Sequence, residues 1–211
     1  MLLRLFDSRV MPLRCVFCGA RTQEAESRLC EGCLDDLPTL RSPAPPVSSP
    51  LEYDVAAVEY VFPVDAAIKA LKFKRKLFYA PAFSELLCAA ANDLPDDIDA
   101  VLPVPLHWRR RWFRGFNQSV EIARPVARHL AVPLINNVRR KRATRFQSGL
   151  SAAERAKNLQ RAFTVRGKLS YRHVLIVDDV TTTGTTARQL AHVLKRASVD
   201  KVSALAIARA T

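Results

Sequence analysis

Apolar residues along the chain alternate between short continuous runs and longer stretches with helical spacing. Five runs indicate strands, of which the fourth is apolar throughout: 54–61, 100–105, 132–135, 174–177 and 201–207. Four stretches place their apolar residues on one helical face: 65–76, 81–92, 117–130 and 187–196. Strands separated by helices predict an α/β fold with a doubly wound, mostly parallel sheet and right-handed crossovers.

The apolar run 174–177 leads into the most informative segment of the chain. Asp178 and Asp179 follow it, and a hydroxyl-rich turn around Gly184 precedes the next helical stretch. A glycine lets the backbone approach a ligand, and amides at a helix N-terminus can donate to a phosphate. The carboxyl end of a parallel strand is where such sheets hold ligands, so the acidic pair is placed for sugar hydroxyls or hydrated magnesium. The alternative is a solvated acidic turn with threonine capping a helix.

This segment resembles the 5-phosphoribosyl-1-pyrophosphate (PRPP) motif of type I phosphoribosyltransferases. In that family the acidic pair contacts the ribose hydroxyls, and the Thr-Gly-x-Thr turn holds the 5′-phosphate. The resemblance implies that Asp178 and Asp179 are the catalytic, ribose-binding residues and that Mg²⁺ is a cofactor. The other PRPP-binding residues that it implies are Val180, Thr181, Thr182, Thr183, Gly184, Thr185 and Thr186.

The net charge of +13 is concentrated in the middle of the chain. Residues 101–172 hold 17 Lys and Arg against two acids, a net charge of +15, which exceeds that of the whole chain. Such a block favours a polyanionic partner, either a pyrophosphate or a nucleic-acid backbone, over a solvated basic face. Within it, Arg114 and Gly115 precede a helix start at Asn117, which indicates a second anion pocket, for pyrophosphate, and makes both residues candidate PRPP-binding residues. A basic surface turn with Trp108 and Trp112 half-buried is the equal alternative.

The second part of the basic block, residues 139–160, is long and punctuated by glycine. A capping box of Ser151 and Glu154 predicts a short helix within it. The segment suits a lid that closes on a phosphorylated ligand. Alternatively, the ring of Phe146 in this segment stacks on a base of single-stranded DNA. The candidate nucleic-acid-binding residues are Arg139, Arg140, Lys141, Arg142, Arg145 and Phe146.

Four of the five cysteines form two C-x-x-C pairs: Cys15, Cys18, Cys30 and Cys33. Paired motifs of this kind indicate a metal site, and four thiolates suit a closed, structural, tetrahedral zinc. Gly19 and Gly32 are expected to give the two knuckles positive φ angles. The fifth cysteine, Cys88, falls in an apolar helical stretch and is expected to be core.

Three regions follow from these patterns. Residues 1–40 form a zinc-finger module with an N-terminal helix, 41–52 a proline-rich linker, and 53–211 the phosphoribosyltransferase-like domain. No apolar run reaches the length of about 20 residues that spans a bilayer. The N-terminal apolar residues are interrupted by charges and lack a signal-peptide core. The expected location is therefore the cytoplasm.

The chain as a whole resembles the ComF family, because the finger and several motifs occur in one order. These motifs lie at 71–74, 103–107, 114–118, 147–151, 155–158 and 178–179. The resemblance implies a part in the uptake of transforming DNA at the inner face of the cell membrane, beside a competence helicase. Thr182 stands where salvage enzymes often carry an aspartate that moves a proton. Two hypotheses stay open, a transferase acting on an unknown acceptor and a catalytically silent protein that binds single-stranded DNA or a nucleotide. A protein that binds PRPP with Mg²⁺ and takes part in DNA uptake fits all the features best.

Overall fold

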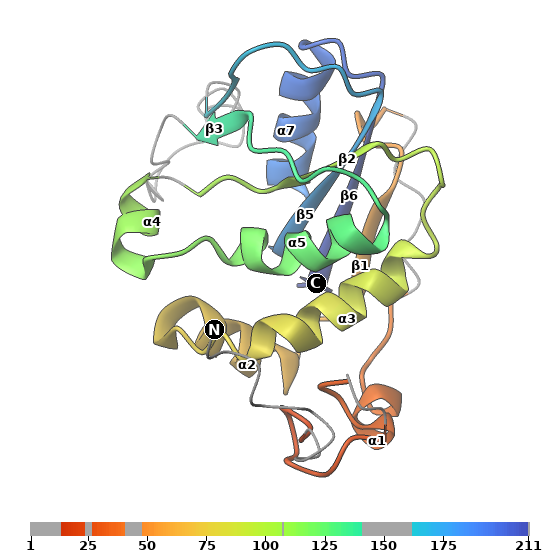
Figure 1. The fold of residues 1–211 in the computed structure, drawn as a ribbon, viewed down its shortest axis with the longest axis vertical. Helices are drawn as coiled ribbons and strands as arrows, with labels where there is room; N and C mark the ends of the chain where they lie inside the picture. Colours follow the sequence, from red (N-terminus) through yellow and green to blue (C-terminus); the bar gives the residue numbers. More distant parts are fainter. Residues whose placement is uncertain (1–13, 24–26, 41–47, 107, 141–161, 211) are drawn as a thin grey trace, which may run out of the picture.

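The structure of the chain is a computed structural model that describes residues 14–23, 27–40, 48–106, 108–140 and 162–210 (Figure 1). The elements are α1 (Glu31–Asp35), β1 (Asp54–Glu59), α2 (Val64–Lys74), α3 (Tyr79–Ala91), β2 (Ala100–Pro103), α4 (Trp108–Arg114), α5 (Gln118–His129), β3 (Val138–Arg140), β4 (Phe163–Val165), β5 (His173–Thr181), α7 (Thr185–Lys195) and β6 (Lys201–Arg209).

Four strands form the central sheet in the order β1-β6-β5-β2, and every neighbouring pair is parallel. Successive side chains of β5 point to opposite faces, and both faces are covered. Leu175 and Val177 pack into a core with α2, α3 and α5, whereas Val174 and Ile176 pack with α7. Burial on both faces explains the unbroken apolar run in the sequence. The predicted doubly wound α/β fold is confirmed.

Two parts of the body differ from the sequence-based prediction. Residues 132–135 form no strand, only a single parallel bridge between Val101 and Leu134. Pro133 has no N–H to extend the pairing, although its carbonyl accepts a bond from the Val101 amide at 2.9 Å. In addition, β3 and β4 pair as a separate two-stranded antiparallel sheet, which the hydrophobic pattern did not predict. Such short strands leave little periodicity to detect.

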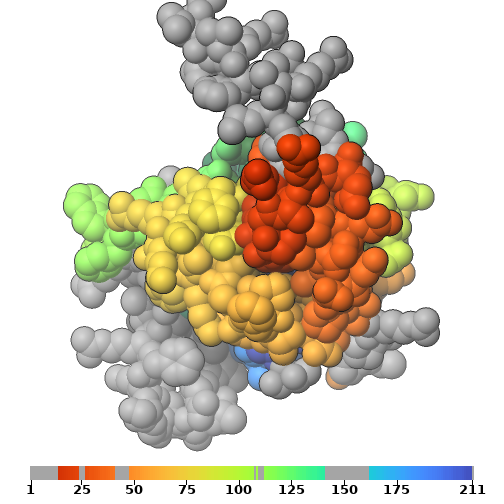
Figure 2. All heavy atoms as spheres, turned by 90° about the horizontal axis from the view of Figure 1, so that it is seen from below, coloured from red at the N-terminus to blue at the C-terminus, as the bar shows by residue number. Residues whose placement is uncertain are grey.

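The four-cysteine module packs directly against the body. The Arg28 amide donates to Glu85 Oε1 on α3 at 2.8 Å, and the Ser27 hydroxyl donates to Oε2 at 3.1 Å. Leu29 and Leu37 are buried in the same core as α3. Figure 2 shows the module in red and orange, lying against the yellow α2 and α3 segments. The module and the body therefore share one hydrophobic core.

Several predicted features lie outside the described residues, and one is wrong. The N-terminal helix falls on residues 1–13, most of the linker on 41–47, and the capping box on 141–161. Gly19 has the expected positive φ of 77°. Gly32 does not, because it lies inside α1. Cys88 is only partly buried, at the edge of the core. None of the helices in the described ranges is long and apolar enough to cross a membrane.

Candidate functional site

The pleat of β5 divides the acidic pair between the two faces of the sheet. Asp178 is partly exposed and lines a cavity on the α7 side. Asp179 points to the opposite face, where only 4% of its surface is exposed. Both residues lie near the carboxyl end of the strand, as expected, but neighbouring positions of a strand cannot present their side chains to the same face.

The turn between β5 and α7 forms one wall of a cavity of about 90 Å³. All the residues after the acidic pair that the resemblance implies for PRPP line it: Val180, Thr181, Thr182, Thr183, Gly184, Thr185 and Thr186. Ala204 and Ala206 of β6 form part of the opposite wall, where their small side chains leave room. The cavity thus lies between the sheet and the N-terminus of α7, where backbone amides and the helix dipole favour an anion.

Gly184 is the residue at which a side chain would close this cradle. Its φ of 67° lies in the left-handed region. A Cβ atom at this position would lie 3.0 Å from Asp54 Oδ2 and 3.0 Å from the Arg188 guanidinium. The turn therefore requires glycine both for its conformation and for the space beside Asp54. Asp54 itself is held by Arg209, whose Nη2 lies 3.1 Å from Asp54 Oδ1.

Two donors hold the Asp178 carboxylate in place. The Ser119 hydroxyl of α5 donates to Oδ1 at 3.2 Å, and the Asp179 amide donates to the same atom at 2.9 Å. Burial, followed by repulsion from the neighbouring Asp179 carboxylate, raises the pKa of Asp178 to about 7. A carboxyl group with such a pKa exchanges its proton near neutral pH, as groups at ligand sites often do.

Asp178 should make the stability of the ligand-free protein depend on pH. Its pKa is about 7 in the fold and about 3.9 in an unfolded chain, so the folded state binds the proton more tightly. This stabilisation is complete below about pH 4 and is lost as the pH rises through 7. We expect the free energy of unfolding in urea to fall between about pH 4 and about pH 7, and Asp178→Asn to remove most of that fall. Equal falls in both proteins would contradict the assignment.

Asp179 is paired with a lysine of α2, on the face of the sheet opposite the cavity. Lys72 Nζ of α2 lies 2.7 Å from Asp179 Oδ1, with the two side chains 18% and 5% exposed. The second oxygen, Oδ2, is buried and has no hydrogen-bond partner among the described residues. A buried carboxylate oxygen without a partner is rare and suits a hydroxyl or a hydrated cation as an additional ligand. Oxygen donors of this kind are those that Mg²⁺ prefers.

Lys72→Met should destabilise the protein far more than loss of a surface lysine. It leaves the Asp179 carboxylate buried without its counter-charge, which typically costs about 3–5 kcal/mol. Lys69→Met on the same helix is the matched control, because Lys69 forms an exposed pair with Asp65 at 2.7 Å and should change little. Urea denaturation at neutral pH measures both variants. Equal stability of the two would mean that the buried pair does not support the fold.

Arg114 ends α4 and Gly115 follows it, and neither residue lines the cavity. Arg114 Nη1 donates to Gln118 Oε1 at 3.0 Å, and its guanidinium lies 5.1 Å from the centre of the Phe73 ring. Asn117 caps α5 as predicted, by accepting a bond from the Ser119 amide at 3.2 Å. This cap fixes the position of Ser119, whose hydroxyl donates to Asp178, so the segment orients the Asp178 carboxylate without lining the cavity.

The candidate nucleic-acid residues are described only in part. Arg139 is exposed on β3, whereas Arg140 is partly buried with its guanidinium 5.5 Å from the Phe163 ring centre. The other four, Lys141, Arg142, Arg145 and Phe146, lie outside the described residues.

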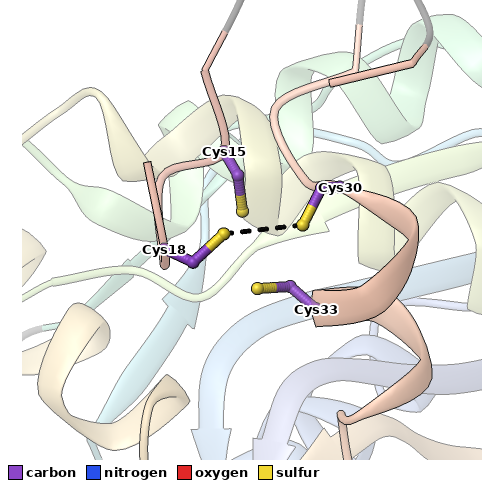
Figure 3. A group of neighbouring side chains, drawn as sticks. All are labelled: Cys15, Cys18, Cys30 and Cys33. Carbon is purple, nitrogen blue, oxygen red and sulfur yellow. Dashed lines mark hydrogen bonds between the residues drawn. The ribbon is translucent and has the colours of Figure 1, made fainter. Parts of the chain in front are cut away.

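The four cysteines converge as the sequence predicts. Their Sγ atoms lie within 4.8 Å of one another, and those of Cys18 and Cys30 are 3.6 Å apart (Figure 3). A tetrahedral zinc with bonds of about 2.3 Å needs sulfur atoms about 3.8 Å apart. Four thiolates leave no open coordination position. The cluster therefore fits a structural zinc site.

Sequence reasoning did not assign a role to the partners of the acidic pair. Lys72 and Ser119 lie on α2 and α5, far from β5 in the sequence, and Asp54 lies at the start of β1. Only Lys72 carried a signal, because it stands within the 71–74 motif. Ser119 and Asp54 are brought to the site by the packing of the helices and by strand order.

Comparison with known proteins relates this chain to a domain family and to named relatives. Residues 117–210, which include β5, the turn and α7, match the phosphoribosyl transferase domain family. The chain is 30% identical to competence protein F of Haemophilus influenzae, over 93% of this chain and 97% of that protein. It is 35% identical to DNA utilization protein YhgH of Escherichia coli (strain K12), over 92% and 89%. A solved structure of the allosteric regulatory enzyme of purine biosynthesis aligns at 20% identity with a TM-score of 0.46, over 67% and 30%.

Proposed function

Because the chain belongs to the ComF family and contains a phosphoribosyltransferase domain, we propose that it binds PRPP with Mg²⁺ and acts in DNA uptake. The observation that carries the proposal is the cavity between β5 and the N-terminus of α7. It joins a carboxylate, Asp178, to a hydroxyl-lined turn at a helix N-terminus. A ribose phosphate presents the complementary groups, hydroxyls at one end and a dianion at the other.

The 5′-phosphate would occupy the turn at residues 182–186. Gly184 leaves its backbone open there, and the Thr183 and Thr185 hydroxyls lie 2.6 Å from each other at the entrance. Amides of the first turn of α7 would donate to the phosphate oxygens. Ala204 and Ala206 of β6 also line the cavity, and its small volume limits the ligand to a compact group such as a single phosphate.

The ribose would lie above Asp178, whose carboxylate accepts hydroxyl protons once it is ionised. Asp179 points to the opposite face and does not line the cavity, so its unpartnered Oδ2 atom would hold a hydrated magnesium ion at the edge of the sheet rather than contact the ribose beside Asp178. Magnesium, when bound, would neutralise charge on the pyrophosphate oxygens. Lys72 lies beside Asp179 and balances its charge on that face of the sheet.

The carboxylates and Thr182 favour different chemistry. A carboxylate facing the ribose can stabilise positive charge that develops at the anomeric carbon, which favours phosphoribosyl transfer. Thr182 has no useful pKa for moving a proton on an acceptor base, which favours binding without transfer. Binding is common to both possibilities and is the function that we propose. Release of pyrophosphate on addition of an acceptor would extend the proposal to transfer.

The role in DNA uptake follows from the relatives, which are named as competence and DNA utilization proteins. We expect this role at the inner face of the cell membrane, beside a competence helicase. A Haemophilus influenzae strain lacking competence protein F can be supplied with this chain, either unchanged or with Asp178→Asn. We expect transformation to be restored only by the unchanged chain when immunoblots give equal protein levels. Full rescue by Asp178→Asn would separate the ligand site from DNA uptake.

A further inference from the structure

Large aromatic side chains are exposed on one surface beside the candidate site. The surface comprises the end of α2, the turn to α3, and α4, and we call it the α2–α4 surface. Trp112 and Phe113 of α4 are 82% and 78% exposed, and Phe73 of α2 is 72% exposed. Trp108 and Phe78 are exposed as well. Tryptophan and phenylalanine gathered on one exposed surface mark an interaction site more often than a chance arrangement.

Two contacts join α2 and the residue that follows it to α4. Arg75 Nη2 donates to the Phe113 carbonyl at 2.8 Å, and the Arg114 guanidinium lies over the Phe73 ring at 5.1 Å. Lys76 Nζ lies 5.9 Å from the centre of the Phe78 ring. Cations therefore lie over two of the exposed rings. In Figure 2 the yellow α2–α3 turn and the green α4 lie at the same side of the molecule.

The two segments that form the surface carry charge of one sign in the sequence. Residues 72–79 and residues 108–114 each contain four Lys and Arg, and neither segment contains Asp or Glu. A partner that fits must therefore be anionic along its length and must also present flat apolar faces. Single-stranded nucleic acid has both properties, because its backbone carries the charge and its unpaired bases are free to stack. Duplex DNA keeps its bases stacked inside and offers only the charge.

The surface is continuous with the candidate ribose site. Lys72, on the same helix as Phe73, pairs with Asp179, and α4 leads through the Asn117 cap to Ser119, which binds Asp178. We propose that the α2–α4 surface binds single-stranded DNA by stacking bases on Trp112, Phe113 and Phe73. The bound strand would then pass beside the phosphoribosyl cavity. The proposal rests on the DNA part of the proposed function and does not require PRPP binding.

An anionic membrane is the other polyanion that exposed tryptophan and lysine can suit. Helices that lie in a membrane surface separate a continuous apolar face from a charged face. On the α2–α4 surface two of the cations instead lie over the rings. The arrangement therefore favours DNA, and vesicles become a control in the test.

The chain offers an internal reporter for this test, because both of its tryptophans, Trp108 and Trp112, lie on α4. Titration with a short oligothymidylate should quench the tryptophan fluorescence and should raise the anisotropy of a labelled oligonucleotide over the same concentration range. Binding seen by anisotropy without quenching would place the DNA on another surface and would overturn the proposal. The matching oligouridylate tests whether the site prefers DNA.

Two double variants identify the surface. Trp112→Ala with Phe113→Ala should weaken oligothymidylate binding by at least about tenfold, since base stacking on one ring commonly accounts for that much. Lys74→Ser with Lys76→Ser should reduce the salt dependence of binding, by about 0.7 in logarithmic slope for each phosphate that the variant no longer neutralises. Arg166→Ser with Lys168→Ser, which removes two exposed cations elsewhere, should change neither property.

Three further outcomes would contradict the proposal. The first is that the aromatic variant binds oligothymidylate as tightly as the unchanged chain. The second is that it loses only the binding of phosphatidylglycerol vesicles, and the third is that it loses only self-association, measured by sedimentation. Calorimetry with magnesium and PRPP on the same variant keeps the two proposals separate. We expect unchanged PRPP binding there, since neither ring lines the cavity. Circular dichroism confirms that each variant is folded.

Discussion

Replacing Cys30 with serine is expected to lower the melting temperature of the zinc-loaded protein by more than about 10 °C. The loss of one thiolate removes a ligand from a site whose metal supplies much of the folding free energy of such small modules. The effect should extend beyond the module, because Leu29 and Leu37 are buried in the core that contains α3. For a chain of this size, about 1 kcal/mol corresponds to about 2–4 °C, so a loss of several kcal/mol exceeds ten degrees.

Cys88→Ser is the matched control, because it makes the same chemical change outside the four-cysteine cluster. We expect it to retain one zinc per chain by atomic absorption and to melt close to the unchanged protein. A strong zinc chelator should reproduce the Cys30→Ser result in the unchanged protein. The structural assignment would be wrong if the chelator removed the metal and left the melting temperature where it was.

The parts of the site that could be predicted from the sequence are those that are local. Residues 174–186 form a contiguous strand, turn and helix start, and each step has its own signal in residue type. The strand is apolar because both of its faces are buried, and Gly184 is required by a positive φ. The cysteine pairs are likewise local, since the C-x-x-C spacing brings two thiols to one turn.

The partners of the acidic pair could not be predicted in the same way. The pairing of Lys72 with Asp179 depends on how α2 packs across the sheet, and that of Asp54 with Arg209 depends on the parallel pairing of β1 with β6. The sequence also left open whether Trp108 and Trp112 are half-buried. Their exposure follows from the position of α4 at the edge of the fold, outside the hydrophobic core.

Asp178→Asn is expected to abolish binding of magnesium and PRPP, which is the second large effect. Asparagine keeps the size of the side chain and can still accept a bond from the Ser119 hydroxyl, so the fold should survive. It carries no negative charge at any pH, and it replaces one carboxylate oxygen with an amide donor. The ribose hydroxyls and a magnesium ion would then lose an ionised acceptor in a partly buried site, where such bonds contribute about 1.5–3 kcal/mol each.

Calorimetric titration of PRPP with magnesium into the zinc-loaded chain tests the central claim most directly. Lys69→Met serves as a folded control with a change on α2 away from the cavity. The unchanged chain and this control should bind one PRPP each with equal affinity, and Asp178→Asn should give no saturable heat. If the unchanged chain fails to bind PRPP, or if Asp178→Asn binds it equally well, the cavity between β5 and α7 is not a phosphoribosyl site.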